Sequence, residues 1–262
     1  MTAAQAVPSS LFRGMLWPTV AVVVGTTVLA TLGTWQLERL AWKEGLLAAI
    51  AARTTAAPAP LPSPASWGGL DPGTYEYRHV VATGTFDHAA EVRVFRPLGD
   101  ARGPFSGLGD LVLTPLKLEG GGTVVVNRGF VPEDRVDPAT RPEGQVTGRV
   151  TVTGLMRSPE SRTAFTPADQ PAKRLWFTRD PGSIAAALGL GDVAPFTIDQ
   201  DAGETPGGLP QGGETVLAFP NNHLSYALTW FGLAATLLGL YASALFRRRR
   251  EAIAADRKGA TP

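Results

Sequence analysis

Two long apolar runs without any charged side chain constrain this chain more than any other feature. Residues 14–37 and residues 224–246 form these runs, which are 24 and 23 residues long. About 20 apolar residues cross the ~30 Å hydrocarbon layer of a bilayer, so we expect a transmembrane helix in each run. A cleaved signal peptide is the competing interpretation of the first run. The run is longer than the ~7–15 apolar residues of a signal and no clear small-x-small cleavage site follows it, so an uncleaved anchor is favoured.

Charge on either side of the runs predicts the orientation. Residues 247–262 carry a net charge of +4, whereas residues 38–223 carry −4. Positive flanks stay on the cytoplasmic side, so the basic tail, and with two spans also the N-terminus at residues 1–13, are expected in the cytoplasm. The region between the spans is then expected to be extracytoplasmic, in a periplasm-like or intermembrane-type space. We expect a two-span protein of a bacterial-type plasma membrane.

The segment after the first span reads as a helical stalk over residues 38–53. Trp35, Arg39, Trp42 and Leu46 recur every three or four residues and therefore share one helix face. This face is either an interfacial anchor, with tryptophans among the headgroups and Arg39 extended toward water, or a binding face. Alternating prolines then predict an extended linker at residues 54–73.

Residues 74–220 have the pattern of a β-rich domain. Alternating apolar residues and glycine-rich turns predict strands over 77–86, 91–97, 110–118, 123–132 and 144–156, and short strands at 174–178, 195–200 and 215–219. Asp180 as N-cap, Pro181 in the first turn and Gly189 as a stop predict one helix. The expected fold is a membrane protein with two transmembrane α-helices flanking an extracytoplasmic, mainly antiparallel β (α+β) domain.

Composition excludes several kinds of chemistry. The chain has no cysteine, and its histidines are His79, His88 and His223. Thiol catalysis, disulfides and cysteine-based metal sites are therefore ruled out, and with three methionines a copper chaperone is a poor interpretation. A net charge of +1 gives no reason to expect nucleic acid as a partner. No nucleotide-binding, hydrolase-elbow or zinc-protease motif is present, so we do not expect an enzyme.

The motif VNRGFVP, at the end of a valine run, admits two interpretations. A β-bulge is the favoured one, with Gly129 supplying an unusual backbone conformation and Asn127 forming a local hydrogen bond. The functional alternative is that Arg128 is held near a membrane-proximal site and aimed at a carboxylate.

His223 stands where polar sequence turns into the second apolar run. Imidazole is a common ligand of haem iron, and a haem at this level could place its ring between the helices. Arg39 or Lys43 could then meet the propionates, and Trp35, Tyr226 and Trp230 could stack on the ring. A histidine that merely ends a helix at the interface is an equally good interpretation of the pattern alone.

Four segments together resemble the Surfeit-locus protein family of cytochrome c oxidase assembly factors. They read LGTWQLERLAWKEGLLAAI, GTFDHAAEVRV, VVVNRGFVP and NNHLSYALTWFGLAATLLGLY, in the family's order. The family's Trp-Gln-x-x-Arg motif matches Trp35, Gln36 and Arg39, its Asn-Arg-Gly motif matches residues 127–129, and its second-span histidine matches His223. Phe130 stands where the family often has tryptophan.

The resemblance implies a function in the respiratory chain. Members of the family resemble haem chaperones, so His223 is expected to ligate the iron of haem a, with Trp35, Arg39, Tyr226 and Trp230 around it. The expected partners are the membrane, the cytochrome c oxidase core subunit that receives the haem, and haem a synthesis enzymes. The alternative is a non-haem membrane scaffold that stabilises the oxidase subunit during assembly.

Overall fold

The computed structural model describes residues 14–217 and 219–259, which form two compact units. One unit contains residues 14–48 and 219–259, and the other contains residues 49–217. The N-terminus expected to lie in the cytoplasm, residues 1–13, falls outside the described residues. Each unit has the secondary structure that its sequence predicts: the first is helical, and the second is mainly β.

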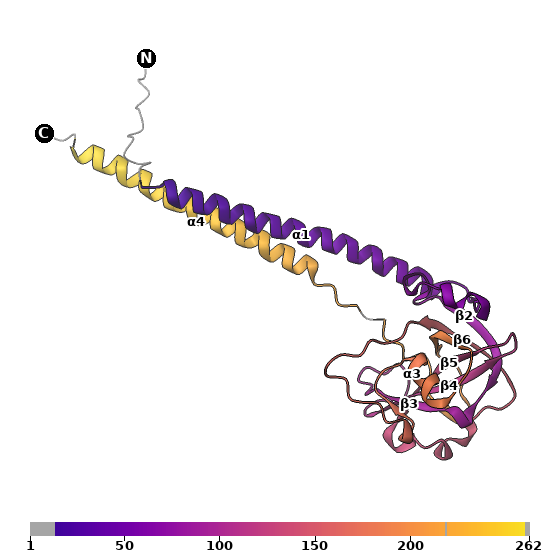
Figure 1. Cartoon of the computed structure of the whole chain (residues 1–262). Coiled ribbons are helices and arrows are strands. Elements are labelled where there is room, and N and C mark those ends of the chain that lie inside the picture. The colour runs from indigo at the N-terminus through magenta and orange to yellow at the C-terminus, as the bar shows by residue number, and fades with distance from the viewer. Residues whose placement is uncertain (1–13, 218, 260–262) are drawn as a thin grey trace. The chain divides into compact units, whose positions relative to one another are not determined.

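The first unit is an antiparallel pair of long helices, α4 (His223–Gly259) and α1 (Leu16–Thr55), of which residues 49–55 belong to the second unit. Both are long and apolar enough to cross a membrane, which confirms the two expected spans (Figure 1). Helix α1 runs without interruption through the expected stalk, and α4 continues from its span into the basic tail.

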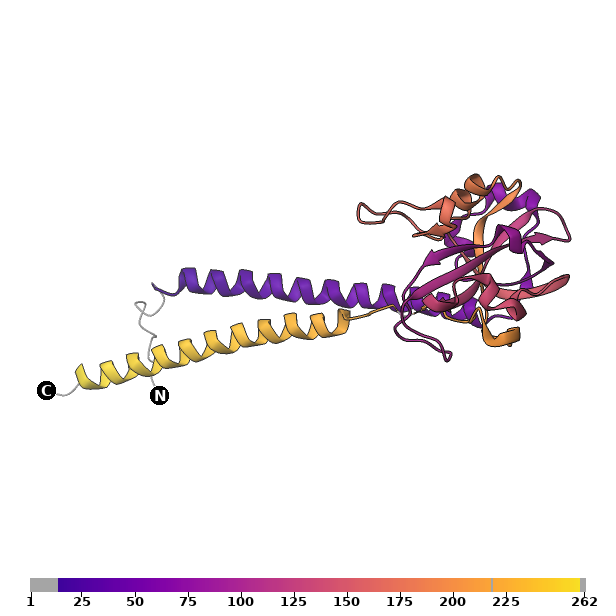
Figure 2. The ribbon, with the colours of Figure 1, turned by 90° about the horizontal axis from the view of Figure 1, so that it is seen from below.

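Helices α1 and α4 run side by side, as Figure 2 shows from a second direction, and glycines allow close contacts at particular points. A Cβ atom added to Gly33 would lie 2.7 Å from the ring of Phe231, and one added to Gly25 would lie 3.1 Å from Leu237. Close backbone approach of this kind is how apolar helices gain packing energy within lipid.

The second unit is an eight-stranded sheet with short helical segments. Its strands are β1 (Ala59–Pro60), β2 (His79–Phe86), β3 (Val92–Phe95), β4 (Gly109–Leu118), β5 (Thr123–Pro132), β6 (Arg149–Arg157), β7 (Leu175–Trp176) and β8 (Val193–Gln200). Its α-helices are α2 (Pro72–Tyr75) and α3 (Pro181–Leu188). Helix α3 begins with the expected cap, because the Asp180 carboxylate accepts a hydrogen bond from the Gly182 N–H.

Five of these strands form a closed ring. The strand order is β1-β2-β6-β8-β5-β4-β3-β7, and an additional pairing joins β2 to β4. Strands β2, β6, β8, β5 and β4 therefore each have a partner on both sides. Most pairings are antiparallel, as expected, whereas β5 and β8 pair in parallel, as do the short edge pairings β1–β2 and β3–β7.

Strand β5 is buried on both faces and separates two apolar cores. Val124 and Val126 belong to the larger core, which also contains Trp67, Tyr75 and residues of the other ring strands, among them Phe196 of β8. Val125 faces a smaller core with Trp176 and with Ile184 of α3. A continuous valine run is the pattern expected of a strand with no solvated face.

The segment expected to be a linker is instead part of the folded domain. Within residues 54–73, β1 pairs with β2, a 3-10 helix spans Pro64–Gly69, and Trp67 is 6% exposed. The Trp67 indole also donates to the carbonyl of Pro62 at 2.9 Å. Only part of the segment is extended, since Pro64–Gly69 is a 3-10 helix and α2 begins at Pro72. The proline pattern gave no sign that Trp67 packs into the core, because its partners, such as Phe196, lie far away in the chain.

Two other local predictions were wrong. Described residues around 215–219 form no strand, and Val216 is 66% exposed. Thr215 contacts Asp199 of β8 through its side chain, and β8 already pairs with β6 and β5 on its two edges. The strand expected from residue 144 begins only at Arg149, after a 3-10 turn at Pro142–Gly144.

Candidate functional site

His223 is the first residue of α4, and its backbone N–H donates to the side-chain oxygen of Asn221 at 3.4 Å. Its imidazole Nδ1 lies 2.7 Å from Oε1 of Gln36 on α1. Asparagine is a preferred residue beside helix starts because its side chain satisfies free backbone N–H groups. The contact with Gln36 brings His223 together with a residue that is 187 positions away in the sequence.

This contact fixes the tautomer of the imidazole. The Gln36 oxygen can only accept a hydrogen bond, so Nδ1 of His223 carries the proton and donates it. Nε2 is then the nitrogen with a free lone pair, and no hydrogen bond joins it to any residue that the structure describes. A histidine oriented through one ring nitrogen, with the other left available, is the usual arrangement of a metal-ligating imidazole.

The other residues predicted for a haem site lie in the same helix pair, and the hydrogen bonds of His223 among the described residues are with Asn221 and Gln36 rather than with them. The Arg39 guanidinium lies over the ring of Trp42, 4.3 Å from its centroid, and Lys43 lies over Phe219 at 5.6 Å. Trp35 and Tyr226 are half exposed on the helix surface, and Trp230 is partly buried. Their grouping around a haem remains a prediction.

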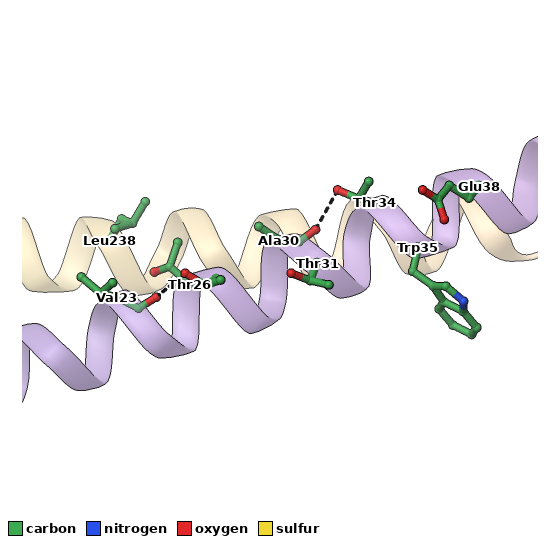
Figure 3. A pocket seen from close by; sticks show the side chains of 9 residues that line it. Val23, Thr26, Ala30, Thr31, Thr34, Trp35, Glu38 and Leu238 are labelled. Carbon is green, nitrogen blue, oxygen red and sulfur yellow. Dashed lines mark hydrogen bonds between the residues drawn. The ribbon is translucent and has the colours of Figure 1, made fainter.

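Trp35 lines a groove on α1. The groove has a volume of about 690 Å³, and Figure 3 shows Thr26, Ala30 and Thr34 along it, with Trp35 and Glu38 at the end farthest from Val23. Leu238 is the α4 residue among its lining residues. The Thr34 hydroxyl donates to the carbonyl of Ala30, so this polar group is satisfied within its own helix.

The Asn127–Gly129 motif forms the predicted bulge. Leu113 pairs with Asn127 and Val112 pairs with Gly129, so Arg128 is the extra residue on β5. Gly129 has a φ of +125°, and its N–H donates to the Asn127 side-chain oxygen at 3.2 Å. The bulge interpretation is therefore confirmed. It also directs Arg128 toward a carboxylate, which belongs to a buried glutamate of the same domain.

Asn127 connects the bulge to a buried ion cluster centred on Asp199. The Asp199 carboxylate accepts hydrogen bonds from Asn127 at 2.9 Å, from Arg157 at 3.0 Å and from Arg179 at 2.8 Å. Burial alone would raise the pKa of Asp199, but the charges of Arg179 and Arg157 outweigh burial and hold this pKa below its ordinary value. A fully paired carboxylate of this kind organises a fold and is not poised for proton transfer.

The remaining histidines are bonded within the domain. Both ring nitrogens of His79 have partners, the Asp201 carboxylate at 2.7 Å and the Ala56 carbonyl at 2.9 Å. His88 bonds the carbonyl of Val146 through Nε2. Among the described residues no group of three or more His, Asp or Glu side chains could hold a metal ion. His223 is thus the histidine best arranged to act as an isolated ligand.

Sequence reasoning placed Gln36 in the Trp-Gln-x-x-Arg motif but gave it no role, and it did not single out Asp199 or Glu91. Asp199 and Glu91 carried no signal, because each is an ordinary acidic residue at the edge of an apolar run. Their partners become visible only when distant strands are placed side by side.

Comparison with known proteins places these residues in a family. A model of the SURF1 family matches residues 23–235, a span that contains Gln36, the bulge and His223. Surfeit locus protein 1 of Xenopus tropicalis is 36% identical over 83% of this chain and 72% of that protein, and its Homo sapiens counterpart is 38% identical over 78% and 69%. The SURF1-like protein of Monosiga brevicollis is 39% identical over 90% of this chain and 88% of its own. The chain belongs to the Surfeit-locus (SURF1) family.

Proposed function

We propose that this protein carries haem a in the membrane and passes it to the core subunit of a haem-copper cytochrome c oxidase during assembly. The observation that carries the proposal is the bond between Nδ1 of His223 and Gln36, which leaves Nε2 free to ligate iron. Membership of the Surfeit-locus family supports the assembly role. The proposal assigns no bond making or breaking to the protein.

The donor at this position fits haem iron. A neutral imidazole is the usual protein ligand of haem, and a hydrogen-bonded second nitrogen raises its basicity and holds the ring in place. A carrier has to release its cargo, and a single histidine binds iron less tenaciously than two axial ligands would. His223 as sole protein ligand is therefore consistent with transfer rather than permanent retention.

The flanking residues are assigned supporting roles in this proposal. Arg39 and Lys43 would pair with the propionates, since their contacts with Trp42 and Phe219 use ring faces and leave N–H donors for carboxylates. Trp35, Tyr226 and Trp230 would cover the apolar macrocycle. The domain between the spans would lie outside the cytoplasm, because the flank after the second apolar run is the positive one.

The test is an optical spectrum of the full chain, purified in detergent after co-expression with haem a synthesis. We expect a haem spectrum in the wild type that is lost in His223→Ala. Gln36→Leu should retain the ligand but weaken haem binding by about 10–100-fold, since it removes the group that orients the imidazole. His79→Gln is the matched control, because it alters a histidine of the β domain and should leave the spectrum unchanged.

Two outcomes would contradict the proposal. Equal haem content and identical spectra in wild type and His223→Ala would remove His223 as the ligand. Absence of haem from both, combined with oxidase assembly that still requires the protein, would favour a scaffold that binds the oxidase subunit without haem. In that case substitutions on the domain surface, rather than His223→Ala, should impair assembly.

A further inference from the structure

A second buried ion cluster lies on the other side of the bulge, around Glu91. The Glu91 carboxylate is 2.5 Å from Nη2 of Arg141 and 3.8 Å from Nη1 of Arg128. The side chains of all three residues are at most 4% exposed. Arg128 also donates to the carbonyl of Gly144, and its guanidinium lies over the ring of Phe86 at 4.8 Å.

This cluster has more positive than negative charge, unlike the one around Asp199. The latter and its neighbours contain the cations Arg96, Arg157 and Arg179 and the carboxylates Glu76, Glu160 and Asp199, so their charges balance. In contrast, one carboxylate serves both Arg128 and Arg141. An uncompensated buried charge is costly, and such imbalance is a mark of sites that meet a ligand.

Unused donors accompany the surplus charge. Nε and Nη1 of Arg128 and Nη1 of Arg141 are buried and form no hydrogen bond with any described residue. Burial, with a smaller contribution from the charge of Arg141, lowers the pKa of Arg128 to about 10, although Glu91 acts in the opposite direction. Both observations indicate that one carboxylate does not fully satisfy the pair.

A cavity of about 470 Å³ adjoins the cluster, and Glu91 is one of its lining residues. Further cations line it: Arg93, whose guanidinium pairs with Asp110 at 2.8 Å, together with Lys173 and Arg174. No carboxylate among the described residues forms an ion pair with Lys173 or Arg174. His88 also lines the cavity, with its Nδ1 buried and without a hydrogen-bond partner among the residues described.

The charges of the cavity and the cluster behind it give the size of the surplus. The cations are Arg93, Arg128, Arg141, Lys173 and Arg174, and the carboxylates are Glu91, Asp110 and Asp137. Five positive and three negative groups leave a surplus of two. This surplus comes from Arg128 and Arg141, which lie behind the cavity and are not among its lining residues. A phosphate monoester or free phosphate carries about 1.5–2 negative charges near neutral pH, whereas a carboxylate or a phosphodiester carries one.

We propose that this cavity is a binding site for a phosphate-type oxyanion, with Lys173, Arg174 and Arg93 at its mouth and the Glu91 cluster behind it. The charge match favours a soluble phosphate or phosphate monoester over the diester headgroup of a lipid. The site is separate from His223 and does not depend on haem binding.

The test is calorimetric titration of the full chain, in an uncharged detergent, with inorganic phosphate and with glycerol 3-phosphate. We expect saturable binding that Lys173→Glu weakens by about tenfold or more, because it reverses one charge at the mouth. Lys173 is exposed and its ammonium has no ion-pair partner among the described residues, so this variant should fold normally. Arg174→Glu should have the same effect. Arg149→Glu is the matched control, since Arg149 is an exposed cation paired with Glu119, which does not line the cavity.

The same titration in nanodiscs separates the two sources of phosphate. Equal binding in phosphatidylcholine and phosphatidylglycerol discs supports a soluble ligand, whereas loss of binding only in phosphatidylglycerol discs supports the same site occupied by a headgroup. Absence of binding up to about 10 mM phosphate would overturn the proposal. So would an equal loss of affinity in Lys173→Glu and Arg149→Glu, because it would show that only overall charge matters.

Discussion

At the scale of single residues, hydrogen bonds distinguish the three histidines. His79 uses both ring nitrogens within the domain, His88 uses one, and His223 uses one in a bond to a neighbouring helix. Sequence position singled out His223 at the start of the second apolar run, but it could not show which ring nitrogens are bonded. A histidine can ligate a metal when one ring nitrogen keeps a lone pair that accepts no hydrogen bond, and this is decided by its contacts.

The pair formed by His79 and Asp201 predicts a dependence of stability on pH. Burial lowers the pKa of His79, but the hydrogen bonds to Asp201 and Ala56 outweigh burial, so this pKa is raised above its ordinary value. The folded state therefore binds the proton more tightly than the unfolded state does. The stabilisation is fully present below the unfolded pKa of about 6.5 and is lost as the pH rises through the folded pKa.

We expect His79→Gln to lower the unfolding temperature of the full chain by about 1–3 °C near pH 6. The difference in unfolding temperature between wild type and variant should shrink as the pH approaches about 9, where the histidine of the wild type is as neutral as the glutamine of the variant. Thermal unfolding in detergent across this range measures the effect. A difference that grows with pH would show that the sign of the linkage is wrong.

At the scale of elements, the bulge in β5 places two neighbouring side chains in two different buried clusters. Asn127 bonds Asp199, while Arg128 reaches Glu91. A regular strand would have no extra residue here, and it would not need the left-handed backbone of Gly129. One irregular position therefore connects the two charge clusters of the domain.

Gly129→Ala should destabilise the domain by about 2–4 kcal/mol. A Cβ atom at this position would lie 1.9 Å from the carbonyl oxygen of Gln211, in addition to the backbone strain at φ +125°. Gly148 is the matched control, because it has a φ of +79° but no atom within 4 Å of an added Cβ. Gly148→Ala should therefore cost only about 1 kcal/mol. Denaturant midpoints measure both, and equal losses would show that strain alone, without the Gln211 contact, sets the cost.

Within the helix pair, Gly33→Ile should separate α1 from α4. The added side chain would displace the Phe231 ring, whereas Gly239→Ile is a control with no atom within 4 Å of the added Cβ. The chain has no cysteine, so Thr19→Cys and Tyr241→Cys, which replace side chains in hydrogen-bond contact, can be joined by a short bismaleimide. We expect the yield of this cross-link to fall by about threefold or more in Gly33→Ile, as loss of close packing requires. An unchanged yield would contradict the observed packing.

Sequence patterns predicted those elements whose causes are local. The bounds of β5 were predicted to the residue because a glycine turn and a valine run define them, and α3 was predicted from Asp180 and its neighbouring proline. The burial of Trp67 and the contact between Gln36 and His223 could not be predicted, because each depends on a partner far away in the chain. At 215–219 the apolar letters suggested a strand, but no neighbouring strand was free to receive it.

At the scale of the whole molecule, charge asymmetry makes a prediction about sidedness. Arg149 in the β domain and Ile253 beyond the second span are both exposed, and single cysteines can replace either in a chain with none of its own. In spheroplasts, whose plasma membrane is intact, a membrane-impermeant maleimide should label Arg149→Cys at least about tenfold faster than Ile253→Cys. The reason is that positive flanks remain in the cytoplasm. Both should be labelled in lysed spheroplasts. The reverse pattern in intact spheroplasts would invert the proposed orientation.

The closed ring of β2, β6, β8, β5 and β4 limits how another protein can recognise this domain. A sheet with a long free edge can accept an additional strand from a partner through backbone hydrogen bonds. Here the terminal strands of the sheet are β1 and β7, each two residues long. These two short edges offer few backbone groups, so strand addition is an unfavourable way for a partner to bind this domain. A partner has to contact side chains on the loops of the domain, such as Phe165, which is 94% exposed. Specificity then depends on individual residues rather than on the fold.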